Sequence, residues 1–238
     1  MSTPKVLIVV PAFNEEKNIF KTVNEILSLK RPVSVLVISD GSRDKTVSEA
    51  KKTKAEVIAL PFNLGIGGAV QTGFKYARDH GFDIAVQVDG DGQHDVQYLE
   101  TILAPVINDE ADMVIGSRFL PPHLGFQSSF VRRIGIHFFA WLISFLTGCK
   151  VTDPTSGFRA YNRKMIKIFA RYYPHDFPEP EAIVVAGRYQ ARIKEVVVQM
   201  RKRGAGNSSI RYLKTLYYMI KVTFAILLDK LKGQHSVD

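Results

Sequence analysis

Residues 83–95, DIAVQVDGDGQHD, end a short apolar run on two carboxylates, each followed by a glycine. The run 83–88 is typical of a buried strand. Asp89 and Asp91, held side by side at its end, repel each other, and a structural turn has no need of such a pair. A divalent cation removes the repulsion, and Asp89, Asp91 and Gln93 offer hard oxygen ligands that suit Mg²⁺ or Mn²⁺, with a substrate diphosphate completing the shell. The glycines let backbone and phosphate approach closely.

Further short apolar runs alternate with helical patterns on both sides of this segment. We expect strands at residues 5–10, 33–39, 55–60, 83–88 and 112–117, and helices at 15–29, 63–81 and 96–108. Such alternation predicts an α/β fold with a parallel sheet and right-handed crossovers. After residue 120 the pattern changes to longer apolar helices and basic clusters.

Polar signals gather where the expected strands end. These ends read PAFNEE, DGSRD, DGDGQHD and GSR. Because the ligand site of an open parallel sheet lies beyond the carboxyl ends of its strands, four such endings point to one site. Asp, Gly, Asn and Ser are also ordinary turn residues, and DGSRD alone is as compatible with a turn as with a site.

Other phosphate-binding and metal-binding motifs are absent from the sequence. No G-x-x-x-x-G-K-[ST] occurs. The stretch GIGGAV (65–70) has Val70 where the dinucleotide fingerprint needs glycine, and we expect it to be a helix N-terminus packed close to the sheet. A calcium loop beginning at Asp89 would lack its glutamate at the twelfth position. His94 is expected to be a solvated residue at a helix start rather than a ligand.

The composition fits a globular protein that binds an anionic partner. Of the 238 residues, 46% are apolar and 23% are charged, and the formal net charge is +9. One cysteine, Cys149, cannot form an internal disulfide, which fits a reducing compartment. The charge leaves nucleic acid, an anionic membrane surface and phosphorylated small molecules open. Nucleic acid is disfavoured as a partner, because no recognised binding motif occurs and the paired carboxylates would be unexplained.

An ordered set of motifs resembles one enzyme family. The motifs are VVPAFNEEKNI, ISDGSRDKT, NLGIGGAVQTGF, VDGDGQHD, GSRF and DPTSGFRAYNR. Together they resemble family 2 glycosyltransferases of the GT-A fold, nearest to the polyprenyl-phosphate sugar transferases typified by dolichyl-phosphate mannose synthase. The resemblance implies a GT-A domain over residues 1–205, including an interface helix at 131–148, and a C-terminal amphipathic helix and tail over 206–238.

The resemblance also implies roles for individual residues. The nucleoside of a nucleotide sugar would be held by Pro11, Phe13, Glu15 and Asp40. The metal and diphosphate would be held by Asp89, Gly90, Asp91 and Gln93. Phosphates of donor or acceptor would be contacted by Arg118, Arg132 and Arg201. Arginine suits this task because its planar guanidinium pairs with phosphate through two hydrogen bonds.

The expected reaction is inverting transfer of a sugar from a UDP- or GDP-linked donor to a polyprenyl phosphate, with Asp91, Arg118 and Asp153 as catalytic residues. Asp153 lies where related hydroxyl-transferring enzymes carry a base. A phosphate monoester needs no base, because its second pKa is near roughly 6, so Asp153 is interpreted here as an orienting residue. The alternative is transfer to a hydroxyl of a cell-surface glycan, with Asp153 as base. Four residues after Arg132 the family often has a polar residue near the acceptor phosphate, but this chain has Ile136, and His137 is a candidate substitute.

Two aromatic-rich segments indicate contact with a membrane surface. Residues 134–149 carry no Lys, Arg, Asp or Glu, but these 16 residues fall short of the roughly 20 needed to span a bilayer. Arg133, His137 and Ser144 fall near one stripe of this helix, and Phe138, Trp141, Leu142 and Phe145 lie elsewhere on it. Residues 209–233 also form an aromatic-rich helical pattern, with lysines on another face. We therefore expect a peripheral protein at the cytoplasmic face, with a small membrane protein or a second copy as candidate partners. Core or oligomer-contact helices are the alternative.

Overall fold

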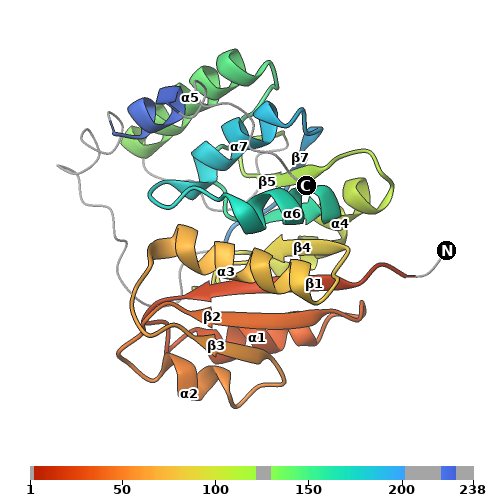
Figure 1. Cartoon of the computed structure of the whole chain (residues 1–238), viewed down its shortest axis with the longest axis vertical. Helices are drawn as coiled ribbons and strands as arrows, with labels where there is room; N and C mark the ends of the chain where they lie inside the picture. The colour runs from red at the N-terminus through yellow and green to blue at the C-terminus, as the bar shows by residue number, and fades with distance from the viewer. Residues whose placement is uncertain (1–2, 122–129, 202–220, 229–238) are drawn as a thin grey trace.

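Seven strands form one mixed sheet in the computed structural model, which describes residues 3–121, 130–201 and 221–228 (Figure 1). The strands are β1 (Val6–Ala12), β2 (Ser34–Ser39), β3 (Glu56–Ala59), β4 (Ile84–Gln87), β5 (Met113–Ser117), β6 (Arg159–Asn162) and β7 (Ile193–Val197). Their order is β3-β2-β1-β4-β6-β5-β7. β6 runs antiparallel to β4 and β5, whereas the other paired strands are parallel. The expected mostly parallel sheet is confirmed.

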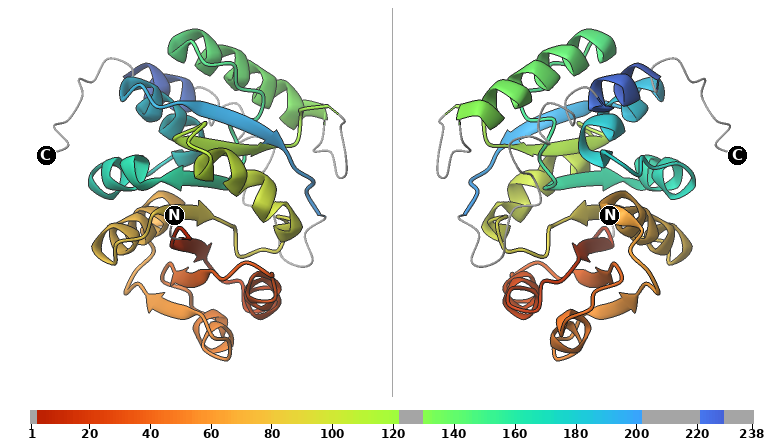
Figure 2. Two further views of the ribbon diagram at one scale, coloured as in Figure 1. Left: turned by 90° about the vertical axis from the view of Figure 1, so that its right-hand side faces the viewer. Right: turned by 90° about the vertical axis from the view of Figure 1, so that its left-hand side faces the viewer.

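Helices cover both faces of the sheet (Figure 2). They are α1 (Ile19–Leu27), α2 (Thr46–Ala50), α3 (Gly65–Asp79), α4 (Leu99–Ile107), α5 (Phe130–Thr147), α6 (Arg163–Arg171) and α7 (Pro178–Arg188), with a 3₁₀ turn at Val96–Tyr98. Residues 221–228 form a further helical segment. One hydrophobic core lies between the sheet and α3, α5, α6 and α7, and a second lies between the sheet and α1, α2 and α4.

The two cores follow from the alternation of side chains along each strand. In β1, Leu7 and Val9 face the first core, whereas Val6, Ile8 and Val10 face the second. The strand is buried on both faces, as expected for the centre of a parallel sheet.

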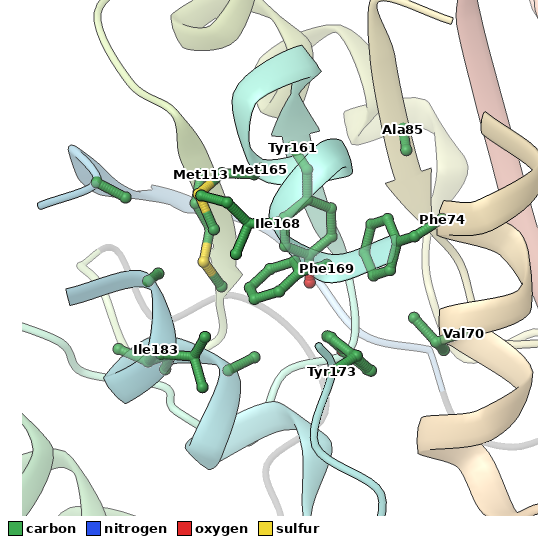
Figure 3. Packing of buried hydrophobic residues seen from close by; sticks show 14 of the residues in the cluster. Val70, Phe74, Ala85, Met113, Tyr161, Met165, Ile168, Phe169, Tyr173 and Ile183 are labelled. Atoms are coloured by element: carbon green, nitrogen blue, oxygen red, sulfur yellow. The ribbon is translucent and has the colours of Figure 1, made fainter. Parts of the chain in front are cut away.

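Four aromatic rings fill the middle of the first core (Figure 3). Phe74 meets Tyr161 edge-on, with 5.0 Å between the ring centroids, and Phe169 meets Tyr173 in the same way at 5.0 Å. Edge-to-face contacts of this kind add to the burial of apolar area. They join α3 and α6 to β6, the antiparallel strand.

The strand order reverses between β1 and β4, which makes this the switch point of the sheet. β2 and β3 lie on one side of β1, and β4 lies on the other. The N–H of Gly90 donates to the carbonyl of Pro11 at 3.2 Å, and the N–H of Asp40 donates to Ala12 at 2.9 Å. The segments after β1, β2 and β4 are therefore joined at one edge, where open α/β sheets bind their ligands.

The five expected strands are present, with ends that differ by one or two residues. The expected helix at 15–29 begins only at Ile19, after Asn14 adopts a left-handed conformation with φ of 55°. The glycine-rich stretch begins a helix whose Ala69 and Val70 pack on β1 and β2, as expected, and its first turn also lies against another loop. A Cβ on Gly67 would lie 2.2 Å from the carbonyl oxygen of Pro174. β6, β7 and α6 were not anticipated.

Candidate active site

The two carboxylates of the DGDGQ segment lie at the switch point, directly after β4. Pairing with β1 continues past the end of the strand, because Val88 donates to the carbonyl of Val9 at 3.0 Å. Asp91 Oδ1 accepts the N–H of Gln93 at 3.0 Å, and Asp89 Oδ1 accepts a bond from Gln87 Nε2 at 3.3 Å. Both carboxylates are partly exposed, so each can face a ligand.

The expectation that His94 is solvated is wrong. The residue is buried, and its ring stacks on Phe158 with 5.2 Å between the centroids and 12° between the planes. His94 forms a bridge with Met200, and the N–H of Arg201 donates to the carbonyl of Gln93 at 2.8 Å. This pairing with a segment more than 100 residues away buries the imidazole behind Asp89.

The candidate nucleoside residues surround the ends of β1 and β2. Pro11 is buried at the end of β1, whereas Phe13 just beyond it is 48% exposed. Asp40 is buried, and its Oδ1 accepts the N–H of Leu64 at 2.7 Å. Glu15 is partly buried and accepts a bond from the side chain of Asn18 at 2.7 Å. Phe13 therefore offers an open ring beside a fixed carboxylate.

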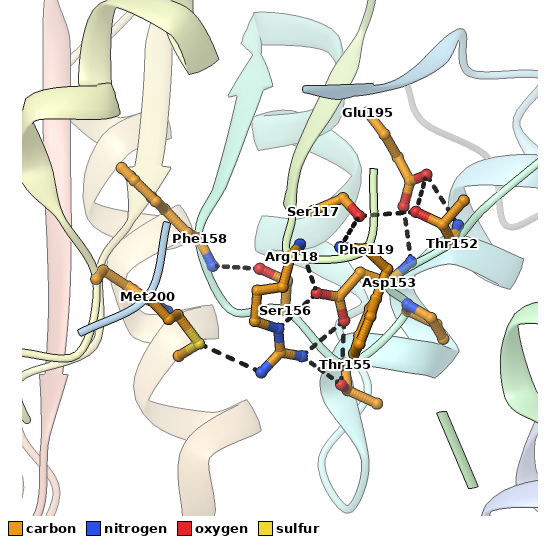
Figure 4. Close-up of polar contacts among 12 residues, drawn as sticks. Ser117, Arg118, Phe119, Thr152, Asp153, Thr155, Ser156, Phe158, Glu195 and Met200 are labelled. Carbon is orange, nitrogen blue, oxygen red and sulfur yellow. Dashed lines mark hydrogen bonds and ion pairs between the residues drawn. The ribbon is translucent and has the colours of Figure 1, made fainter. Parts of the chain in front are cut away.

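Arg118 and Asp153 face each other in a buried ion pair (Figure 4). Arg118 Nε lies 2.6 Å from Asp153 Oδ2, and Nη2 lies 2.7 Å from Oδ1. Arg118 Nη2 also donates to Thr155 at 2.8 Å, and its Nη1 donates to the sulfur of Met200. Burial disfavours the charged guanidinium, but the bonds and charge of Asp153, with the charge of Asp89, outweigh it and raise the pKa of Arg118.

Glu195 on β7 fixes the backbone that carries Asp153. Its Oε1 accepts the N–H of Asp153 at 2.8 Å, and its Oε2 accepts the N–H and the hydroxyl of Thr152, each at 2.8 Å (Figure 4). Burial raises the pKa of Glu195, and the bonds from Asp153 and Thr152 oppose that rise. The loop at residues 152–155 is therefore tied to the sheet.

Two further residues of the site, Arg159 and Glu179, were not among those the motifs indicated. Arg159 is fully buried and donates to the carbonyls of Pro154, Ser156 and Glu179 at 2.6–2.8 Å. Burial raises the pKa of Glu179, the charge of Arg159 opposes this, and the charge of Asp89 adds to it. Glu179 therefore lies within electrostatic reach of Asp89, although Pro178 and Glu179 also form the first turn of α7.

Gly157, in the TSGF motif, was not singled out from the sequence. A Cβ at this position would lie 2.9 Å from Asp89 Oδ2 and 3.0 Å from Oδ1. Such a contact is too short for any side chain, so glycine is what admits the Asp89 carboxylate at this place. The signal in the sequence was a glycine between two polar segments, which is also what any turn contains.

Arg201 and Arg132 are the other two basic residues that were expected to contact phosphates. The guanidinium of Arg201 pairs with Glu25 and Asp95, each at 2.7 Å, while its backbone lies beside Gln93. Arg132 belongs to α5, but its side chain lies outside the described residues.

The acceptor candidates on α5 point in different directions. Ile136 is buried and faces the core. His137 is exposed, and its ring lies 5.5 Å from that of Phe119, the residue after Arg118. The structure therefore leaves His137, and not Ile136, available on the surface near GSRF.

The carboxylates suit a divalent metal held jointly with a substrate. Within the described ranges, no group of three His, Cys, Asp or Glu side chains is arranged to enclose an ion. Mg²⁺ is commonly bound by one or two carboxylates together with substrate phosphates, so a closed protein cage is not required. Asp89 and Asp91 are partly exposed at one strand end, and each is a carboxylate oxygen donor. The donor set therefore fits such an ion.

An apolar stripe crosses the outer surface of α5. Ile134, Phe138, Trp141 and Phe145 are 37–75% exposed, and Trp141 stacks on Phe145 with 6.1 Å between the centroids. Leu142, expected among the outward residues, instead faces the core.

The helical segment 221–228 adds to this apolar surface at the same end of the molecule (Figures 1 and 2). It packs Val222 and Ile226 into the first core and leaves Phe224, Leu227 and Leu228 exposed. Among the described residues, no helix is long and apolar enough to cross a membrane. The remainder of the expected C-terminal helix, including Ile210 to Ile220 and Leu231, lies outside the described residues.

Comparisons with known proteins agree on one family. The model of glycosyl transferase family 2 matches residues 7–169. The chain is 30% identical over 218 residues to the UDP-N-acetylglucosamine–dolichyl-phosphate N-acetylglucosaminyltransferase of Methanococcus voltae, covering 84% of the chain and 86% of that protein. It is 30% identical over 172 residues to the undecaprenyl-phosphate mannosyltransferase of Micrococcus luteus, covering 68% of each.

A solved structure has the same fold. Glucosyl-3-phosphoglycerate synthase from Mycobacterium tuberculosis, in complex with Mn²⁺, UDP and phosphoglyceric acid, superposes with a TM-score of 0.72 at 21% identity, covering 98% of this chain and 80% of that one.

Proposed function

Because the chain belongs to glycosyl transferase family 2 and has the expected GT-A fold, we propose that it transfers a sugar from a nucleotide sugar to a polyprenyl phosphate. The names of two relatives, which act on dolichyl phosphate and undecaprenyl phosphate, support this acceptor class. The donor is UDP- or GDP-linked, and the sugar is left open. The reaction takes place at the cytoplasmic face of the membrane.

The Arg118–Asp153 pair is the observation that most supports a lipid phosphate, rather than a hydroxyl, as the acceptor. A hydroxyl acceptor needs a general base, and Asp153 is the residue that would serve. Asp153 is fully buried, and both of its carboxylate oxygens are bound by Arg118. A phosphate monoester brings its own anionic oxygen at neutral pH, because its second pKa is near about 6. Positioning then replaces deprotonation. No observation favours the glycan-hydroxyl alternative.

The residues at the strand ends divide the work of the reaction. Phe13 and Asp40 bind the nucleoside, and Asp89 and Asp91 would hold Mg²⁺ or Mn²⁺ beside the diphosphate. When bound, the metal neutralises the negative charge that grows on the leaving nucleoside diphosphate. Arg118 contributes a fixed positive charge beside Asp89. Direct attack by the acceptor oxygen on the anomeric carbon, through an oxocarbenium-like transition state, inverts the configuration.

The apolar surface on α5 and 221–228 brings the enzyme to its acceptor. Exposed aromatic side chains next to lysines suit the interface of an anionic membrane. Lys221, the first described residue of the 221–228 segment, pairs with Asp176 at 3.1 Å. The net charge of +9 favours the same surface. A small membrane protein or a second copy of the chain stays a candidate partner for this face.

The test is an assay with a panel of labelled UDP- and GDP-sugars, liposomes that contain polyprenyl phosphate, and Mg²⁺ or Mn²⁺. We expect one labelled lipid product that is extractable into organic solvent and labile to mild acid. Excess chelator should abolish its formation, and Asp91→Asn should reduce it by at least about 100-fold in a folded protein. Full transfer in chelator would refute the metal role. Transfer to glycan without lipid phosphate would refute the acceptor.

A further inference from the structure

His94 touches Asp89 with both of its ring nitrogens. Its Nδ1 accepts the backbone N–H of Asp89 at 3.2 Å, and its Nε2 lies 3.6 Å from Asp89 Oδ2. The side chain of His94 is 2% exposed. A buried residue that only packs in the core would not be expected to contact one carboxylate residue through both ring nitrogens. His94 therefore interacts specifically with Asp89.

The backbone contact determines where the imidazole carries its proton. A nitrogen that accepts a hydrogen bond bears no hydrogen, so Nδ1 of His94 is unprotonated. The neutral ring therefore carries its proton on Nε2, the atom nearest the Asp89 carboxylate. Within the described part of the chain, this buried Nε2 has no hydrogen-bond partner. A buried N–H without a partner is costly, and the acceptor at hand is Asp89 Oδ2.

The surroundings prevent His94 from turning away. Phe158 stacks on one face of the ring, and the bridge to Met200 fixes the backbone. The carboxylate is confined as well, by Gln87 Nε2 at 3.3 Å and by Gly157, where a Cβ would lie 2.9 Å from Oδ2. The remaining direction for Asp89 is the solvent-facing site.

We propose that His94 is a positioning residue, which as a neutral Nε2–H tautomer holds the Asp89 carboxylate in the orientation that binds the metal and diphosphate. The inference rests on the proposed role of Asp89 in metal binding. A neutral donor steadies the carboxylate without cancelling its charge, so Asp89 keeps its attraction for a cation. Partners of this kind behind metal ligands commonly change metal affinity by about 10- to 100-fold.

The tautomer is tested directly by ¹⁵N NMR of the labelled protein, with correlations across the imidazole rings. We expect His94 to show an unprotonated Nδ1 and a protonated Nε2. His80 provides an internal contrast, because its Nδ1 lies 2.9 Å from the carbonyl oxygen of Tyr76, which can only accept. A protonated Nδ1 on His94 at neutral pH would overturn the proposal.

The effect on metal binding is tested by titration of Mn²⁺, with UDP or GDP present, using electron paramagnetic resonance to count free ion. His94→Phe keeps a ring on Phe158 but removes both nitrogens, and it should weaken Mn²⁺ binding by about 10-fold. His94→Gln places an amide N–H near the position of Nε2 and should recover most of the affinity, whereas His94→Asn is too short to do so. His80→Phe, at an exposed position, should bind as the wild type does.

The possible results separate this inference from the proposed function. If the wild type binds Mn²⁺ and Asp91→Asn does not, but His94→Phe binds normally, His94 has no positioning role. If the wild type itself binds no Mn²⁺ with either nucleotide, the metal role of Asp89 fails, and the task given to His94 fails with it. If His94→Phe does not fold, equal affinity of His94→Gln and His94→Asn overturns the proposal.

Discussion

Arg118 and Asp153 form a two-bond ion pair in which Asp153 has no exposed surface and Arg118 little. Removing one partner from a buried pair leaves an uncompensated charge and typically costs about 3–5 kcal/mol. We therefore expect Asp153→Ala to lower the free energy of unfolding by this amount in denaturant titrations. Glu100→Ala, which breaks the surface pair with Arg31, should cost less than about 1 kcal/mol.

The same pair separates stability from catalysis. The double variant Arg118→Met/Asp153→Leu replaces the ions by apolar groups and should regain most of the stability that Asp153→Ala loses. It should not regain sugar transfer, because the positive charge beside Asp89 is gone. Stability and turnover would be measured on the same preparations, and recovery of both would show that the arginine charge has no part in the reaction.

Gly157→Ala should weaken metal and nucleotide binding with little loss of fold. The added methyl group would lie within 3.0 Å of both Asp89 oxygens and must displace the carboxylate. We expect affinity for Mn²⁺ with UDP to fall by about 10-fold, as for other losses around a metal ligand. Gly187→Ala is the control. Its methyl group would lie 3.2 Å from Thr147, a residue with no assigned role in metal or nucleotide binding. Equal affinities for the two variants would contradict the prediction.

Glu179→Gln should change how stability depends on pH. Burial raises the pKa of Glu179, so the folded protein keeps a proton that the unfolded chain loses above about pH 4.3. The stability that this proton supplies is present below that pH and is lost as the pH rises through the folded pKa. The melting temperature of Glu179→Gln, relative to the wild type, should therefore rise between acid and neutral pH.

Glu100→Gln should change the pH dependence of stability in the opposite direction. The hydrogen bond from Arg31 lowers the pKa of Glu100, although its burial opposes this. Its stabilising effect is present at neutral pH and is lost on acidification, so the relative melting temperature of the variant should fall slightly as the pH rises. Parallel pH profiles for the two variants would show that Glu179 is not desolvated.

Trp141→Gln with Phe145→Gln should weaken binding to liposomes that contain anionic lipid. These residues contribute the most exposed aromatic surface of α5, and apolar burial supplies roughly 25 cal/mol per Å². Co-sedimentation should fall while the melting temperature stays unchanged. Phe20→Gln, which removes a 44% exposed aromatic residue of α1, is the matched control. If sedimentation is unchanged but the oligomeric state shifts, the stripe is a contact between copies.

His137→Ala should raise the KM for the lipid phosphate and leave the KM for the donor unchanged. His137 is exposed beside Phe119, whereas the donor residues lie at the ends of β1, β2 and β4. We expect an increase of about 10-fold, the cost of one charge-assisted hydrogen bond of roughly 1.5 kcal/mol. Steady-state kinetics with each substrate varied in turn would measure it. A change in the donor KM alone would place His137 elsewhere in the reaction.

Much of the fold could be predicted from the local pattern of apolar and polar residues. β1, β2 and β5 are apolar runs bounded by polar ends, so periodicity was sufficient to predict them. β6 was missed because it is four residues long and contains Arg159 and Asn162, and its place is decided by β4 and β5 on either side. β7 was missed because the adjacent charged residues Lys194 and Glu195 interrupt the apolar residues of this edge strand.

The candidate site shows the same division. Asp89 and Asp91 could be recognised because the two carboxylates lie within a few residues of each other, directly after a predicted strand. Such a pair is unusual, and a short stretch of sequence is enough to reveal it. The burial of His94 depends on its pairing with Met200. The Asp153 carboxylate is bound by Arg118, and the backbone N–H of Asp153 is bound by Glu195. Contacts across such separations leave no local signal, which is why His94 was expected in solvent.

The position of β6 also governs how the sheet can be assembled. β6 is made after β5 but lies between β4 and β5, so the strand that carries the carboxylates has an open edge until residues 159–162 arrive. An N-terminal fragment ending before Arg159 would present β4 as an unpaired apolar edge, a template for aggregation. Such a fragment cannot serve as a minimal nucleotide-binding module, and a permuted chain should keep β4, β5 and β6 together.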